Sequence, residues 1–169
     1  FELAQAHLDI LKLSTSREIA NDAMDLSLLI TDNTGLDTST AAMQDYAAIE
    51  LLVFQNKLSE AVTALDAMLK KYPSHSLTDE IFFKKAAIYE RMGAFEKAVE
   101  NLNKIVSNPQ YDILSDDALF RMAYIYEESL KDKEKAQQLY NEFLVKHQGS
   151  VYVAEARKRF RKLRGDAVN

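Results

Sequence analysis

The stretch Asp79–Glu90, DEIFFKKAAIYE, returns 37 positions later as Asp116–Glu127, DDALFRMAYIYE. A second match follows each copy, with Phe95-Glu96-Lys97-Ala98 after the first and Lys133-Glu134-Lys135-Ala136 after the second. The shared residues of the first match recur at the spacing of one helix face. They are the pairs Asp79/Asp116, Phe83/Phe120, Ala86/Ala123, Ile88/Ile125, Tyr89/Tyr126 and Glu90/Glu127. The pattern predicts a helix, a short turn and a second helix, repeated along the chain.

The same period can be followed upstream to residue 42. Aligning Ala61 with Ala98 places Asn56 opposite Gly93. Both residue types tolerate positive φ, which a tight turn between helices commonly needs. Pro73 is expected to end the second helix of this unit, because proline interrupts the helical hydrogen bonds. The repeat at 113–149, in contrast, carries one extra residue in its turn, Ser129–Asp132.

These patterns predict an all-α fold, an α-α superhelix of about nine antiparallel helices in a single domain. We expect Ser150 to cap the last helix. Because the chain begins at Phe1, without a Met and inside a helical pattern, it is expected to be a fragment of a longer protein. The expected parts are a divergent helical pair at 1–41, repeats at 42–76, 77–112 and 113–149, and a capping helix at 150–164.

Composition excludes several classes of protein. The chain has 47% apolar residues, which is enough for a core, and only 4 Gly and 2 Pro, which is few for an all-β fold. The absence of Cys excludes disulfides, thiolate metal sites and a cysteine nucleophile. No apolar run is long enough to predict a membrane span. The net charge of −5 argues against a nucleic-acid partner for the surface as a whole.

The repeats resemble the tetratricopeptide repeat, which has a bulky residue, a small residue and Tyr in its first helix and Ala with an aromatic or Leu in its second. Asp45 and Ile49 depart from this pattern in the repeat at 42–76. The resemblance implies a solenoid that holds another protein. The matching residues are Phe82, Ala86, Tyr89, Ala98 and Leu102, then Leu119, Ala123, Tyr126, Ala136 and Tyr140.

The end of the chain, residues 140–163, is similar to the final repeat of bacterial cell-envelope proteins of this family. Examples are the cell-division coordinator of the Tol-Pal system and the lipoprotein subunit of outer-membrane β-barrel assembly. Tyr152, Ala154, Ala156 and Leu163 carry the similarity, whereas His147–Ser150 stands where those proteins have a proline. This resemblance favours the periplasm or cell envelope over the cytoplasm.

The first helices of the repeats are expected to line a concave groove that binds a peptide or a partner helix. Aromatic residues lie among charged ones there, which suits buried contact combined with a defined register. Alternatively, Phe83 and Phe120 are core residues, whereas Tyr124 is expected to be exposed because its counterpart, Ala87, is small. The predicted groove residues are Tyr46, Glu50, Phe54, Phe83, Ala87, Arg91, Phe120, Tyr124 and Glu128.

A second candidate surface is the basic last helix. Residues 151–169 carry six positive and two negative charges, against 15 and 24 in the rest of the chain. Such a helix can bind phosphate groups, an anionic membrane surface or an acidic partner, or it can be the solvated outer face of a capping helix. Its apolar residues are too few for membrane insertion. The predicted basic patch is Arg157, Lys158, Arg161 and Arg164.

Catalysis has little support in the sequence. His7, His75 and His147 fall in different repeats and show no metal-binding or triad spacing, and there is no glycine-rich phosphate loop. We therefore expect no enzyme activity, no cofactor and no metal. The predicted function is a non-catalytic scaffold for a protein or peptide partner. The alternatives are a structural module for self-association within a larger envelope complex and anion binding by the basic helix.

Overall fold

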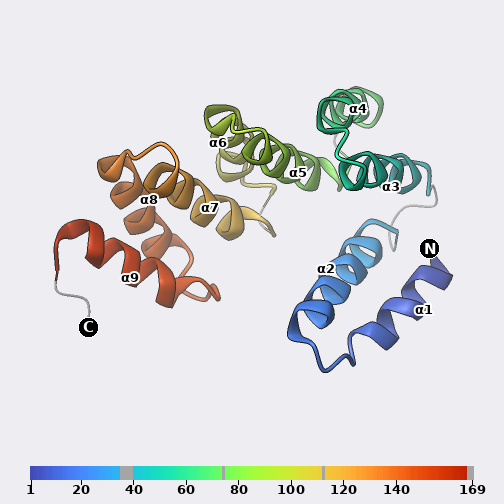
Figure 1. Ribbon diagram of the computed structural model, residues 1–169, viewed down its shortest axis with the longest axis horizontal. Helices are drawn as coiled ribbons and strands as arrows, with labels where there is room; N and C mark the ends of the chain where they lie inside the picture. The colour runs from blue at the N-terminus through green and yellow to red at the C-terminus, as the bar shows by residue number, and fades with distance from the viewer. Residues whose placement is uncertain (35–39, 74, 112, 167–169) are drawn as a thin grey trace. The chain divides into compact units, whose positions relative to one another are not determined.

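A computed structural model describes residues 1–34, 40–73, 75–111 and 113–166, and these contain α-helices and turns but no strand (Figure 1). This confirms the all-α class. The chain divides into two compact units, Phe1–Leu77 and Thr78–Asn169, which we describe separately. The helices in the described residues are α1 (Glu2–Leu11), α2 (Arg17–Thr34), α3 (Ala41–Phe54), α4 (Leu58–Lys71), α5 (Thr78–Arg91), α6 (Phe95–Val106), α7 (Ser115–Glu128), α8 (Lys133–Lys146) and α9 (Val153–Arg164).

The turns inside the repeats close in the way that the alignment predicts. Asn56 has φ 59° and Gly93 has φ 72°, which confirms that both take the left-handed conformation. Equivalent backbone hydrogen bonds close these two turns, from Lys57 N to Leu52 O at 2.9 Å and from Ala94 N to Tyr89 O at 2.8 Å. Positive φ therefore reverses the chain direction at the same repeat position in both units.

The turn between α7 and α8 accommodates the extra residue. Its closing bond runs from Asp132 N to Tyr126 O at 2.9 Å, one residue further along than in the shorter turns. Lys131 takes the positive φ, 58°, and the Asp132 side chain caps α8 by accepting a hydrogen bond from Lys135 N at 2.9 Å. The insertion therefore widens the turn and leaves the faces of both helices in register.

In unit 1, α3 and α4 pack through apolar residues and are joined by a polar contact at Asp45. The Asp45 carboxylate accepts hydrogen bonds of 2.7 Å from both Lys71 Nζ and Tyr72 Oη. The bond from Lys71, and then that from Tyr72, lowers the pKa of Asp45. This contact explains why an acid can stand where the repeat pattern has a bulky residue, because the acid links the two helices by charge instead of by packing.

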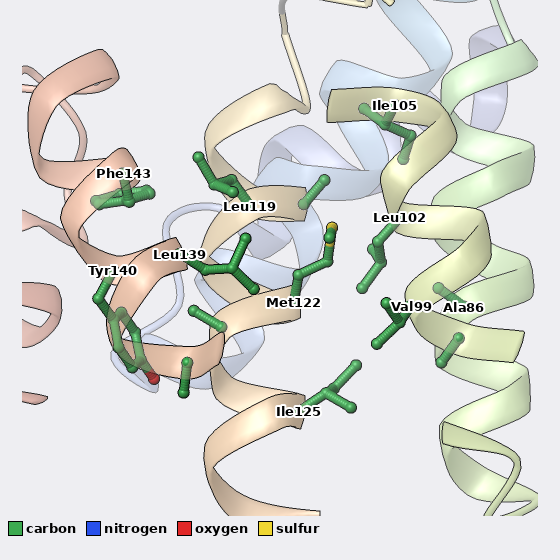
Figure 2. Packing of buried hydrophobic residues seen from close by; sticks show 14 of the residues in the cluster. Ala86, Val99, Leu102, Ile105, Leu119, Met122, Ile125, Leu139, Tyr140 and Phe143 are labelled. Atoms are coloured by element: carbon green, nitrogen blue, oxygen red, sulfur yellow. The ribbon is translucent and has the colours of Figure 1, made fainter. Parts of the chain in front are cut away.

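In unit 2, one core runs through α5 to α9. Four small residues are almost fully buried where helices approach, namely Ala86, Ala98, Ala123 and Ala136. Figure 2 shows Val99 and Leu102 of α6 directed toward Met122 of α7. Small side chains at the crossings let the helix backbones approach, and the larger side chains between them fill the remaining volume.

The last helix begins later than the sequence predicts. α9 starts at Val153, with Tyr152 as its N-terminal flanking residue, so Ser150 is not its cap. The Ser150 hydroxyl accepts a hydrogen bond from Tyr152 N at 3.2 Å and stabilises the preceding turn instead. Gly165, with φ 90°, ends the helix.

Candidate functional site: the first-helix face of unit 2

The first helices of unit 2 are joined by an ion pair that occurs twice. Arg121 of α7 donates from Nε to Glu90 of α5 at 2.8 Å and from Nη2 at 3.3 Å. Arg159 of α9 donates from Nη1 to Glu127 of α7 at 2.9 Å. Glu127 follows Glu90 by 37 residues and Arg159 follows Arg121 by 38, the difference being the residue inserted in the α7–α8 turn. The same contact therefore links each first helix to the next.

The two ion pairs differ in burial. Glu127 and Arg159 have 6% and 21% of their side chains exposed, against 17% and 47% for Glu90 and Arg121. Glu127 also accepts a hydrogen bond of 2.9 Å from the Tyr140 hydroxyl, and burial together with this bond raises the pKa of Tyr140. The pair at α9 is thus a buried contact, and the pair at α7 lies at the surface.

Tyr124 lies beside the buried pair and is 39% exposed. The Arg159 guanidinium is 4.7 Å from the centroid of its ring, a cation–π contact. Arg159 also donates to Glu128 at 3.2 Å and to Glu155 at 2.8 Å. One arginine therefore holds the ring of Tyr124 and both acids of the α7 C-terminus in fixed positions.

Three of the predicted groove residues belong to the packing of their units. Tyr46 is only 3% exposed, so it lies in the core of unit 1 and is not a lining residue. The Phe120 ring stacks on Tyr152 at 4.7 Å between centroids and meets Phe143 edge-on at 5.7 Å. Tyr46, Phe83 and Phe120 share one repeat position, and Phe83 is also half-buried against the core. The aromatic residue at this repeat position packs against the core, as the alternative interpretation of Phe83 and Phe120 predicts.

The remaining groove residues are accessible to different extents. In unit 1, Phe54 is 88% exposed at the end of α3, and Glu50 is half-buried. In unit 2, Arg91 is exposed, whereas Ala87 and Glu128 are half-buried. We call the surface of α5 and α7 that carries Ala87, Glu90, Arg91, Arg121, Tyr124 and Glu128 the first-helix face.

The basic helix separates into two sets of side chains. Arg157, Lys158 and Arg161 are exposed, and Arg164 pairs with Asp166. Arg159 points toward Glu127 and does not belong to the exposed set. The spacing of the arginines in α9 does not show which of them are exposed and which are paired. The one indication is that Arg159 occupies the same repeat position as Arg121.

A hollow of about 720 Å³ lies on the other side of unit 2, between α6 and α8 and over α7. None of the predicted site residues lines it. Its rim carries polar and charged residues at helical spacing, with Glu96, Glu100 and Asn103 on α6 and Lys135, Glu142 and Lys146 on α8. This spacing is the feature of the sequence that could have predicted the hollow. The solvated helix faces of ordinary repeats show the same pattern, so it does not identify a site.

The described residues hold no group of three or more His, Asp or Glu side chains that could bind a metal ion. The three histidines lie apart in sequence and setting. His75 Nδ1 accepts a hydrogen bond from Leu77 N at 3.1 Å in unit 1, and the His147 ring lies 5.5 Å from that of Phe143 in unit 2. Among the described helices, none combines the length and the apolar character that a membrane span requires.

Comparison with known proteins agrees with this repeat geometry. A family model described as the tetratricopeptide repeat protein 21 ARM repeat matches residues 4–143. The chain belongs to this family. No curated protein matches the tetratricopeptide repeat chain.

A solved tetratricopeptide repeat protein from Parabacteroides merdae has the same fold. The two are 18% identical with a TM-score of 0.57, and the match covers 96% of this chain. The chain spans 61% of the length of that protein. The likeness confirms the all-α superhelical repeat class. Repeat families of this type present extended surfaces to protein partners and are typically non-catalytic.

Proposed function

We propose that the chain is an interaction scaffold that binds a peptide or a partner helix on the first-helix face of unit 2. The observation that carries this proposal is the exposed ring of Tyr124, held by Arg159 and adjoining the ion pair of Arg121 and Glu90. Tyrosine and arginine are the residue types that most often dominate binding energy at protein interfaces.

The contacts within this surface favour specific binding. Because Arg159 already orients the Tyr124 ring, a partner loses less conformational entropy when it packs against that ring. Arg121 is 47% exposed and keeps donor capacity toward solvent beside Glu90. A partner with an apolar side chain for the ring and an acid for Arg121 would match this arrangement.

Following the resemblance of residues 140–163, we propose the cell envelope as the location of this protein.

Site-specific photocrosslinking tests the proposal. Benzoylphenylalanine replaces Tyr124 in one variant and the exposed Asn103, which lines the hollow between α6 and α8, in the other. After irradiation in the source cells, we expect a protein adduct from position 124 and none from position 103. Mass spectrometry of the adduct identifies the partner and the contacted segment.

A charge variant serves as the specificity test. Arg121→Glu should reduce the adduct at position 124. The new carboxylate lies beside Glu90, and both repel the acid that the partner is expected to supply. Lys133→Glu is the matched control on α8, with the same charge change at an exposed position. An adduct from position 103 alone would place binding in the hollow and overturn the proposed site.

A further inference from the structure

The exposed cations of α9 occupy positions that are buried in the preceding first helix. Arg157 and Arg161 follow Leu119 and Ala123 of α7 by 38 residues, the spacing that also relates Arg159 to Arg121. Leu119 and Ala123 are fully buried in the core that includes Ala136 of α8. α9 therefore carries arginines on the face that in α7 receives the second helix. An apolar helix cannot pack there without burying two charges.

The cations on this side of α9 are exposed and form no hydrogen bond with another side chain in the described part of unit 2. Arg157, Lys158, Arg161 and Lys162 lie within about 140° of the helix circumference at 3.6 residues per turn, and all are exposed. None forms an ion pair in the described part of unit 2. Arg161 contributes to the lowered pKa of Asp166, but the hydrogen bond from Arg164 is the main cause. We call these four residues the α9 basic face.

Unit 1 carries a surface of opposite charge on α2. Four acids recur at spacings of four, three and seven residues, so they lie within about 80° of the helix circumference. They are Glu18, Asp22, Asp25 and Asp32. All four are exposed, and none pairs with a described residue of unit 1. Residues 1–77 as a whole carry five positive and eleven negative side chains. We call these four acids the α2 acidic face.

We propose that the α9 basic face of one copy binds the α2 acidic face of a second copy. Both surfaces are helical and exposed, neither forms an ion pair with a described residue of its own unit, and they carry four charges each of opposite sign. An acidic helix that packs against α9 places carboxylates beside Arg157 and Arg161. An apolar helix would leave both charges without a counterion. Exposed Ile19 and Leu26 border the acids of α2 and add apolar contact.

This association joins two different surfaces and depends on salt. It gives a two-fold dimer where both α9–α2 contacts form between the same two copies, and a ring or an open chain of copies where they do not. The charges are solvent-exposed, so the attraction weakens as the Debye length falls from about 30 Å at 0.01 M salt to about 10 Å at 0.1 M. The proposal is independent of the first-helix face, whose residues take no part in it.

Charge reversal on each surface tests the proposal with the whole chain. One variant carries Asp22→Lys and Asp25→Lys, and the other carries Arg157→Glu and Arg161→Glu, which leaves the Arg159–Glu127 pair intact. Sedimentation velocity measures the weight-average mass across protein concentration at about 0.02 M and about 0.3 M salt. We expect the mass of the unaltered chain to rise with concentration only at the lower salt, and neither variant alone to associate.

Mixing the two variants at equal concentration should restore the association, because each then faces a complementary surface on the other. Lys133→Glu with Lys135→Glu is the matched control, since it makes the same change in net charge on α8 and should leave association unchanged. Circular dichroism verifies that every variant is folded. A monomeric unaltered chain at the lower salt overturns the proposal. So does a mixture that stays monomeric, or a control that loses association as the α9 variant does.

Discussion

Removal of the Arg159 side chain is expected to detach α9 from α7 while the rest of unit 2 stays folded. Arg159→Ala leaves the Glu127 carboxylate, 6% exposed, with the Tyr140 hydroxyl as its remaining hydrogen-bond partner in the buried site. It also removes the cation–π contact with Tyr124. A buried charge that loses its counterion cannot recover its hydration without opening the structure around it.

The expected loss follows from the burial of each contact. Removing one partner of a buried pair costs about 3–5 kcal/mol, and because 21% of the Arg159 side chain reaches solvent, we expect the lower end of that range. The contact with the half-exposed Tyr124 adds about 0.5–1 kcal/mol. The bonds to Glu128 and Glu155, whose side chains are 39% and 45% exposed, add little. The expected decrease in the free energy that opens α9 is about 3–4 kcal/mol.

Amide hydrogen exchange followed by mass spectrometry measures this decrease locally. The α9 amides should exchange at least about 100-fold faster in Arg159→Ala, since about 1.4 kcal/mol corresponds to a factor of ten. Arg157→Ala is the matched control, two residues away and exposed, and it should change exchange by less than about threefold. Urea unfolding followed by circular dichroism reports on the remaining helices.

A double-mutant cycle with Glu127→Gln isolates the pair itself. The loss in the double variant should be smaller than the sum of the two single losses, because Arg159 and Glu127 depend on each other. If α9 exchange in Arg159→Ala matches that in Arg157→Ala, the contact does not hold α9. If the losses simply add, the contribution of Arg159 comes from its packing and not from the ion pair.

Other predictions address single features of each unit. Arg121→Ala removes the more exposed copy of the repeated ion pair and should lower the free energy of unfolding by only about 0.5–1 kcal/mol in urea denaturation. Lys131→Gly should raise it by about 0.5–1 kcal/mol, because glycine takes the observed positive φ without strain, and a lower urea midpoint would contradict this. Ala136→Leu should lower it by about 1–3 kcal/mol, since Ala136 is fully buried, and an unchanged midpoint would reject the close approach at that residue. Unit 1 should lose stability as pH falls below about 4, because the lowered pKa of folded Asp45 stabilises the fold above the pKa of the unfolded chain and this contribution disappears on protonation. Asp45→Asn should flatten that pH dependence in thermal melts.

The periodicity of the sequence was sufficient to predict the repeats and their turns. The alignment placed Asn56 opposite Gly93, and both have positive φ. It also placed Ala98 and Ala136 at the same position of the second helix, and both are fully buried. These features depend on local conformation and on the face that one helix turns toward its neighbour, and both are encoded within a single repeat.

The periodicity of the sequence was not sufficient to predict which side chains are exposed. Tyr46 shares its repeat position with Phe83 and Phe120, but no pattern within one helix states whether a ring at that position faces solvent or a neighbour. Ser150 has the side chain of a good N-cap, yet it stabilises a turn three residues before α9 begins. The start of α9 coincides with a contact distant in the sequence, since its flanking residue Tyr152 stacks on Phe120.

The repeat pattern of the sequence specifies a helical repeat protein and the positions of its turns. That Arg159 pairs with Glu127 and contacts the ring of Tyr124 follows from the tertiary structure. The physical reason is that a repeat encodes its own helix faces. The partner of a charge is chosen by the helix packed against it, at a distance of 32 residues for this pair.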